Sequence, residues 1–215
     1  GPTTSSLARR KARLIHCTFD ADLDPGTNPF PTEYDLAPQS WQLLSHAGVF
    51  SQARLDMGTQ RLLAQIPSGN EARDIIDLGC GNGVVGLVAG QRNPQARLTF
   101  LDESYRALAS AQHNWQHAFG ARPARFEVGD GLQSEAAAGA DLVLCNPPFH
   151  DSQAMGDATA WRMFTGARRV LRSSGELIVV GNRHLAYHAK LRRLFGQCEV
   201  LDSDAKFVVL RSRTR

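Results

Sequence analysis

Short apolar runs alternate with longer amphipathic stretches from residue 74 to the end of the chain. A run such as residues 74–78 (DIIDL) is too short for a typical helix and has the apolar character of a buried strand. The runs predict strands over residues 74–78, 97–102, 125–128, 141–145 and 176–180. Apolar residues at helical spacing predict helices over residues 83–90, 104–119, 158–171 and 185–195, with Ser104 as an N-cap.

Strands that alternate with helices form a parallel sheet with helices on both faces. Two last apolar runs, 198–201 and 206–210, predict an antiparallel hairpin at the end of that sheet. A further short helix is predicted over residues 54–66, ended by Pro67 and Gly69. The expected fold class is therefore α/β and Rossmann-like, with a seven-stranded, mostly parallel sheet.

Residues 1–40 have little periodicity and are rich in Pro, Asp and Thr, which predicts an extended lead-in or linker. Residues 41–215 are then expected to form one domain. The chain begins Gly1-Pro2 without a methionine, as after protease cleavage, so we expect it to be part of a longer protein.

The composition narrows the class of protein. Hydrophobic residues make up 42% and charged residues 21%, which is typical of a globular domain and excludes disorder. No apolar run reaches about 18 residues, so no membrane span is expected. The cysteines form no close pair, which indicates reduced thiols in a cytoplasmic protein and no metal site: Cys17, Cys80, Cys145 and Cys198.

The charge is uneven although the net value is only +3. From residue 151 onward there are twelve basic and six acidic residues, whereas residues 1–150 hold twelve basic and fifteen acidic ones. A basic half suits a polyanion such as RNA, although it also fits an ordinary solvated surface. The candidates for phosphate contacts are Arg168, Arg169, Arg172, Arg183, Arg192 and Arg193.

The first predicted strand leads into a glycine-rich turn, residues 77–83 (DLGCGNG). Gly79 and Gly81 allow a sharp turn and a close approach of the backbone to a ligand. Acids follow the next two strands. Asp102 is placed to accept ribose hydroxyls, and Asp130 to accept an adenine amino group. Their other readings are an acid at the start of a helix for Asp102 and an ordinary turn residue for Asp130. This pattern predicts a nucleotide-containing ligand.

Asp77, at the end of the first strand, distinguishes between cofactors. A carboxylate there would repel the pyrophosphate of a dinucleotide, whereas it suits a sulfonium and an ammonium group. We therefore expect S-adenosylmethionine rather than NAD. The other reading of Asp77 is a carboxylate that only stabilises the turn.

The fourth predicted strand is followed by Asn146, Pro147, Pro148 and Phe149, our candidate catalytic residues. Two prolines make a stiff loop that lacks two N–H donors, so its carbonyls are available as acceptors. The Asn146 oxygen and the Pro147 carbonyl would accept both N–H groups of a nucleobase amine and orient its lone pair. Phe149 offers a face on which the base can stack. Without these roles, the segment would be a rigid turn with a core aromatic.

Several segments together resemble the bacterial ribosomal RNA guanine-N2 methyltransferases, which have the class I methyltransferase fold. The resemblance covers about residues 45–211 and rests on 48–51 (GVFS), 55–59 (LDMGT), 77–83, 146–150 (NPPFH) and 167–169 (ARR). Residues 181–185 (GNRHL) and 206–210 (KFVVL) favour the large-subunit type over the small-subunit type.

The resemblance implies methyl transfer from S-adenosylmethionine to N2 of a specific guanine in 23S ribosomal RNA. It also implies a non-catalytic N-terminal half outside this sequence. The implied cofactor site comprises Phe50, Asp56, Asp77, Gly79, Gly81, Asp102, Glu103, Asp130, Gly131 and Asn146. Phe50 and Asp56 would lie beside the methionine end or the substrate; their other readings are a core aromatic and a helix N-cap.

Two alternatives stay open. An Asn-Pro-Pro-aromatic loop also serves methyltransferases acting on adenine N6 or a protein glutamine amide, although a Tyr would be more typical of those. The chain could also be a non-catalytic RNA-binding module that keeps the fold; an intact glycine turn and loop favour the enzyme.

Overall fold

The computed structural model describes residues 2–9, 12–24, 26–133, 135–148 and 153–215. The chain forms two compact units, Gly1–Phe30 and Pro31–Arg215. In the first, β1 (Thr3–Ser5) and β2 (Ile15–Cys17) pair as an antiparallel hairpin. The second holds the sheet and its helices.

A seven-stranded sheet with the order β10-β11-β9-β8-β5-β6-β7 forms the centre of this second unit. Its strands are β5 (Asp74–Leu78), β6 (Arg97–Asp102), β7 (Arg125–Val128), β8 (Ala140–Cys145), β9 (Leu171–Asn182), β10 (Glu199–Ser203) and β11 (Phe207–Arg213). Strands β5 to β9 run parallel, whereas β11 pairs antiparallel with both β9 and β10. The expected seven-stranded, mostly parallel sheet with a terminal hairpin is confirmed.

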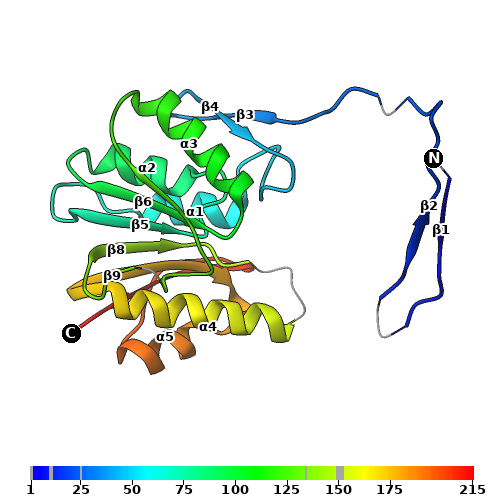
Figure 1. The fold of residues 1–215 in the computed structure, drawn as a ribbon. Coiled ribbons are helices and arrows are strands. Elements are labelled where there is room, and N and C mark those ends of the chain that lie inside the picture. The colour runs from blue at the N-terminus through cyan, green and yellow to red at the C-terminus, as the bar shows by residue number, and fades with distance from the viewer. Residues whose placement is uncertain (1, 10–11, 25, 134, 149–152) are drawn as a thin grey trace. The chain divides into compact units, whose positions relative to one another are not determined.

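Helices cover both faces of the sheet, as expected (Figure 1). They are α1 (Met57–Gln65), α2 (Val84–Arg92), α3 (Tyr105–Phe119), α4 (Gln153–Val170) and α5 (Tyr187–Phe195), with a short 3-10 turn at Arg183–Leu185. Helices α1, α2 and α3 lie on one face, and α4 and α5 on the other (Figure 1). Ser104 caps α3, as predicted, by accepting a hydrogen bond from the Ala107 N–H.

Each face of the sheet has its own apolar core. Under α2 and α3, Phe100 lies edge-on to Trp115 with a centroid distance of 5.4 Å, and both side chains are almost fully buried. Under α4 and α5, Phe164 lies edge-on to Tyr187 at 5.1 Å. Because both faces are covered, the middle positions of the central strands are mostly apolar, and polar residues lie mainly near the strand ends, which is why the strands could be recognised from short apolar runs.

Helix α2 lies unusually close to the sheet at Gly86. A Cβ placed on Gly86 would be 2.2 Å from Cε1 of Phe100, so no side chain fits there. The close approach brings the N-terminus of α2 to the carboxyl ends of β5 and β6.

A hairpin of β3 (Thr32–Leu36) and β4 (Trp41–Ser45) was not predicted. It belongs to the unit Pro31–Arg215, and Leu36 is buried in its core. The residues of β3 alternate between half-buried and exposed until Leu36, so in sequence they look like a polar loop. The assignment of residues 1–40 as a lead-in stays a prediction, but residues 32–36 form a strand.

Candidate functional site

A cleft of about 410 Å³ lies where β5, β6 and β8 end. In a parallel sheet this edge is the usual place for a ligand. Most of the predicted site residues line the cleft, namely Phe50, Asp77, Gly79, Gly81, Asp102, Glu103, Asp130, Gly131, Asn146, Pro147 and Pro148. Phe149 lies outside the described residues.

The glycine turn forms one wall of the cleft. Gly79, Gly81 and Gly83 have φ values of 71°, 55° and 83°, which favour glycine because it has no Cβ. Two N–H groups of the turn, those of Gly79 and Cys80, donate to the Leu101 carbonyl at 2.8 and 3.1 Å. The turn is therefore fixed to the end of β6.

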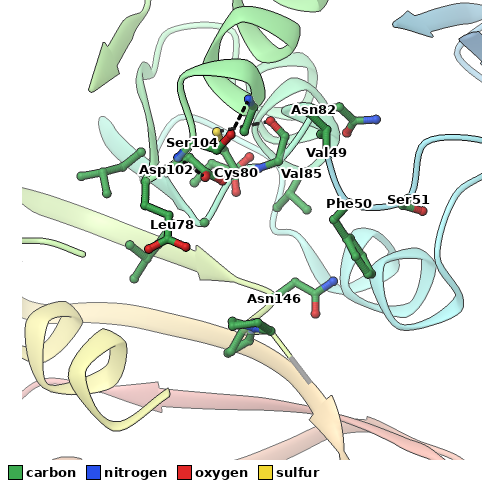
Figure 2. A pocket seen from close by; sticks show the side chains of 18 of the residues that line it. Val49, Phe50, Ser51, Leu78, Cys80, Asn82, Val85, Asp102, Ser104 and Asn146 are labelled. Carbon is green, nitrogen blue, oxygen red and sulfur yellow. Dashed lines mark hydrogen bonds between the residues drawn. The ribbon is translucent and has the colours of Figure 1, made fainter. Parts of the chain in front are cut away.

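Asp102 connects the glycine turn to the start of α3. Its Oδ2 accepts from the Gly81 N–H at 2.9 Å, and its Oδ1 accepts from the Ser104 N–H at 2.9 Å. Figure 2 shows Asp102, Ser104 and Cys80 gathered on the side of the cleft formed by the turn. A carboxylate has about four acceptor positions, so both oxygens keep capacity for a ligand.

Asp77 is only 2% exposed, and its Oδ2 accepts from the Gly86 N–H at 2.8 Å. Burial raises the pKa of Asp77 to about 8; the Gly86 N–H opposes the rise and the Asp102 charge adds to it. The carboxyl group stabilises the first turn of α2, as the turn-stabilising reading of Asp77 had it, and it also lines the cleft. Its contact with a cofactor stays a prediction.

Asp130 lies at an exposed part of the cleft and forms an ion pair with Arg162 of α4. Their side chains are 58% and 53% exposed, so water screens this pair and it adds little to stability. Arg162 was not among the predicted site residues. It lines the cleft from a helix whose sequence gives no sign of a partner 32 residues away.

Asn146 follows β8 and has its side-chain amide in the cleft, toward which the ring of Phe50 also points (Figure 2). Its Nδ2 donates to Thr59 Oγ1 at 2.8 Å. Its Oδ1 is buried and has no hydrogen-bond partner among the described residues. Such an acceptor is rare in a native structure and costs stability unless a ligand satisfies it.

Asp56 does not line the cleft. It is the N-cap of α1, because its Oδ2 accepts from the Thr59 N–H at 2.9 Å, as one reading of the sequence had it. Thr59 does line the cleft, although the sequence analysis had not singled it out. Its hydroxyl contacts Asn146, which is 87 residues away in sequence.

A buried amide network holds the other side of the glycine turn. Asn114 of α3 accepts from the Leu44 N–H at 2.8 Å and donates to the carbonyls of Leu44 and Asn82, each at 2.9 Å. The Asn82 Nδ2 lies 3.2 Å from both Tyr34 Oη and Ser45 Oγ. The β3–β4 hairpin is thus hydrogen-bonded to the turn.

Most of the arginines proposed for phosphate contacts have partners within the chain. Arg169 donates to carbonyls after β7, Arg172 pairs with Asp74 and Asp141, and Arg183 donates to the Asp204 carbonyl. The guanidinium of Arg193 lies over the Trp161 ring at 5.5 Å.

Over residues 2–148 and 153–215, apart from the gaps given above, no three His, Cys, Asp or Glu side chains gather as a metal site. Within the same residues, no helix is long and apolar enough to cross a membrane.

The parallel sheet with its terminal hairpin, the glycine turn after β5 and the acid ending β6 define the class I methyltransferase fold. The chain belongs to the methyltransferase small domain family, which it matches over residues 40–211. Relatives named ribosomal RNA large subunit methyltransferase G are 47–54% identical to it over 99% of its length.

One such relative, from Streptomyces avermitilis, is 54% identical over 99% of this chain, and one from Stutzerimonas stutzeri is 51% identical over 99%. The chain spans only 57% and 56% of the lengths of these relatives. Among solved structures, a T. thermophilus 16S rRNA N2 methyltransferase in complex with AdoMet and guanosine matches with a TM-score of 0.79. It is 23% identical, and the match covers 100% of this chain and 58% of that one.

Proposed function

We propose that this chain transfers the methyl group of S-adenosylmethionine to the exocyclic N2 of a guanine in large-subunit (23S) ribosomal RNA, in the cytoplasm. The observation that carries the proposal is Asn146 Oδ1, a buried acceptor at the edge of the cleft for which the described part of the chain supplies no partner. A planar nucleobase amine is a donor suited to this oxygen. The names of the relatives support RNA as the substrate, and the guanosine complex of the T. thermophilus protein supports guanine.

The cleft fits S-adenosylmethionine in shape and in charge. A Cβ placed on Gly81 or on Gly131 would meet nothing within 4 Å, so open space adjoins the backbone there. Burial raises the pKa of Asp77 to about 8, and a cation such as the ammonium or the sulfonium would favour its ionised form, so binding of the cofactor and ionisation of Asp77 would be coupled. Asp102 keeps acceptor capacity for the ribose hydroxyls. When bound, this cofactor would supply an electrophilic methyl group, with S-adenosylhomocysteine as the leaving product.

The other predicted residues would contact the same cofactor. Gly79 and Gly81 would bring backbone close to its methionine part, and Phe50 would lie between that part and the base. Glu103, Asp130 and Gly131 would contact the adenosine. Because Arg162 bonds Asp130 Oδ2, the adenine amino group would donate to Asp130 Oδ1.

The chain would act on the guanine mainly by positioning it. Asn146 Oδ1 would accept one N–H of the amine and the Pro147 carbonyl the other, which aims the nitrogen lone pair at the methyl group. Pro147 and Pro148 keep this loop stiff. A general base of tuned pKa is not needed, because the nitrogen becomes strongly acidic once it is methylated and would release its proton to water. A guanine within paired RNA would first have to leave its stack.

The test is transfer of labelled methyl from S-adenosylmethionine to undermodified ribosomal RNA, followed by nucleoside analysis. We expect N2-methylguanosine, in the large-subunit RNA only. A label in N6-methyladenosine or in protein would replace the proposal with one of the alternative N-methyltransferase activities. Cofactor binding without transfer to any RNA would overturn it for this 215-residue chain.

A further inference from the structure

The Asn146 amide can take two orientations of nearly equal shape, and only one of them suits a nucleobase amine. With its oxygen toward the base, the amide accepts an N–H. With its nitrogen toward the base, two donors would face each other. Something in the structure must therefore choose between the orientations.

The neighbour that decides is the Thr59 hydroxyl, 2.8 Å from Asn146 Nδ2. A hydroxyl can donate one proton and accept at its lone pairs. If the Thr59 hydroxyl donated to Asn146, the amide oxygen would turn toward Thr59 and away from the base. The orientation of Asn146 thus depends on where the Thr59 proton goes.

That proton is directed to Asp56. Thr59 Oγ1 lies 3.4 Å from Asp56 Oδ2, a long hydrogen bond, and the same oxygen accepts the Thr59 N–H at 2.9 Å. A carboxylate can only accept, so it attracts the hydroxyl proton and leaves the Thr59 lone pairs facing Asn146. The amide then has to present its NH₂ group to Thr59.

We propose that Asp56 and Thr59 are positioning residues that fix the Asn146 amide with its oxygen toward the substrate amine. The inference rests on the proposed function, because it assigns Asn146 the role of acceptor. Asp56, which does not line the cleft, would act through the Thr59 hydroxyl and not by direct contact with the base.

The start of α1 is built to hold this chain of hydrogen bonds. Thr59 is 4% exposed, so water competes little for its hydroxyl. A Cβ on Gly58 would be 3.0 Å from both Asp56 Oδ2 and Phe207 Cε1. Because Gly58 has no side chain, the Asp56 carboxylate and the Phe207 ring can both lie close to the start of α1.

The test compares Thr59→Val, which keeps the shape but removes the hydroxyl, with Thr59→Ser, which keeps the hydroxyl. We expect Thr59→Val to lower kcat for RNA methylation by about 10- to 100-fold, as for an unpaired buried donor. Its Kd for S-adenosylmethionine should stay within about twofold of wild type. Thr59→Ser should recover most of kcat even if its Tm is as low as that of Thr59→Val.

Asp56 has a matched pair as well. Asp56→Asn keeps an oxygen that can accept from Thr59, so we expect kcat close to wild type. Asp56→Ala removes that oxygen and should lower kcat, although less than Thr59→Val does, because the Thr59 lone pairs remain available.

A second readout does not depend on activity. In ¹⁵N-labelled protein, the side-chain NH₂ signal of Asn146, identified by its loss in Asn146→Ala, should exchange slowly in wild type and Thr59→Ser but fast in Thr59→Val. Equal exchange in all three, or full kcat in Thr59→Val, would overturn the positioning role. Absence of methylation by wild type, with the exchange difference intact, would instead overturn only the proposed function.

Discussion

Asp77 and Asn146 are polar side chains that neighbouring parallel strands bring to one cleft, and they are held in different ways. Asp77 is almost fully buried and uses one oxygen to stabilise the start of α2. Asn146 donates from its nitrogen to Thr59, and its oxygen has no partner within the residues that the structure describes. The first arrangement favours a positive ligand, whereas the second favours a neutral hydrogen-bond donor.

Replacing Asn146 by Ala removes the free acceptor without changing the charge of the cleft. We expect methyl transfer to fall by at least about 100-fold, the usual loss when one preorganised hydrogen-bonding group is removed. Calorimetry should give an S-adenosylmethionine Kd within about threefold of wild type. Full activity of Asn146→Ala would exclude the assigned role of the loop.

Asp77 should make the stability of the ligand-free chain depend on pH. Its pKa in the folded chain, about 8, lies above the usual value of 3.8. Its contribution to stability is therefore fully present below about pH 4 and is lost as the pH rises through about 8. We expect the Tm of wild type to fall between pH 6 and pH 9 by more than that of Asp77→Asn. Parallel Tm curves for the two proteins would show that Asp77 is ionised throughout this range.

At the scale of elements, the cleft depends on how closely α2 approaches the sheet. Gly86 permits this approach, and the Phe100 ring below it has little freedom, because it stacks on Phe126 at 4.9 Å and meets Trp115 at 5.4 Å. A side chain at Gly86 would displace the helix and, with it, the Gly86 N–H that donates to Asp77.

We expect Gly86→Ala to lower the free energy of unfolding by about 1–3 kcal/mol, the usual cost of overpacking a core. Urea denaturation measures this change, and the affinity for S-adenosylmethionine should fall in parallel. The matched control is Gln91→Ala, an exposed change on the same helix, which should stay within about 0.5 kcal/mol. Equal stability of Gly86→Ala and Gln91→Ala would mean that α2 can shift at little cost.

The elements differ in how far they could be predicted from the sequence. Apolar strands and a glycine turn are local patterns, so β5, β6, β8 and the cleft at their ends could be predicted. The β3–β4 hairpin could not, because a partner 70 residues away, Asn114, holds β4. Thr59 could not be predicted as a site residue for the same reason, because its contact with Asn146 exists only in the folded chain.

On the scale of the whole molecule, fewer basic residues are available to contact RNA than their number suggests, because some are paired within the chain. Arg172 forms ion pairs with Asp74 and Asp141, and it helps to hold the pKa of both carboxyl groups below the usual range. Such an arginine contributes to the fold. Arg192 is exposed on α5 and is a better candidate for RNA, so the two residues should behave differently when replaced.

We expect Arg192→Ala to weaken RNA binding and to reduce the slope of log K against log salt by about one. Arg172→Ala should leave RNA affinity unchanged and lower the free energy of unfolding by about 0.5–1 kcal/mol. Filter binding at several salt concentrations and urea denaturation measure the two effects. The opposite pattern would place the RNA on the side of the molecule where Arg172 lies.

The amide network around Asn82 sets a limit on how far the chain can be shortened. Asn114 bonds both groups of the Leu44 backbone, and Asn82 reaches Tyr34 and Ser45, so the hairpin supplies partners that the glycine turn otherwise lacks. A truncated version that starts at Trp41, as the pattern of the sequence alone would advise, loses Tyr34 and strand β3. A version that starts at Pro31 keeps them. Residues 31–215 are therefore expected to be the smallest fragment that keeps the cleft and its supporting network, which sets the boundary for fusing this unit to another protein.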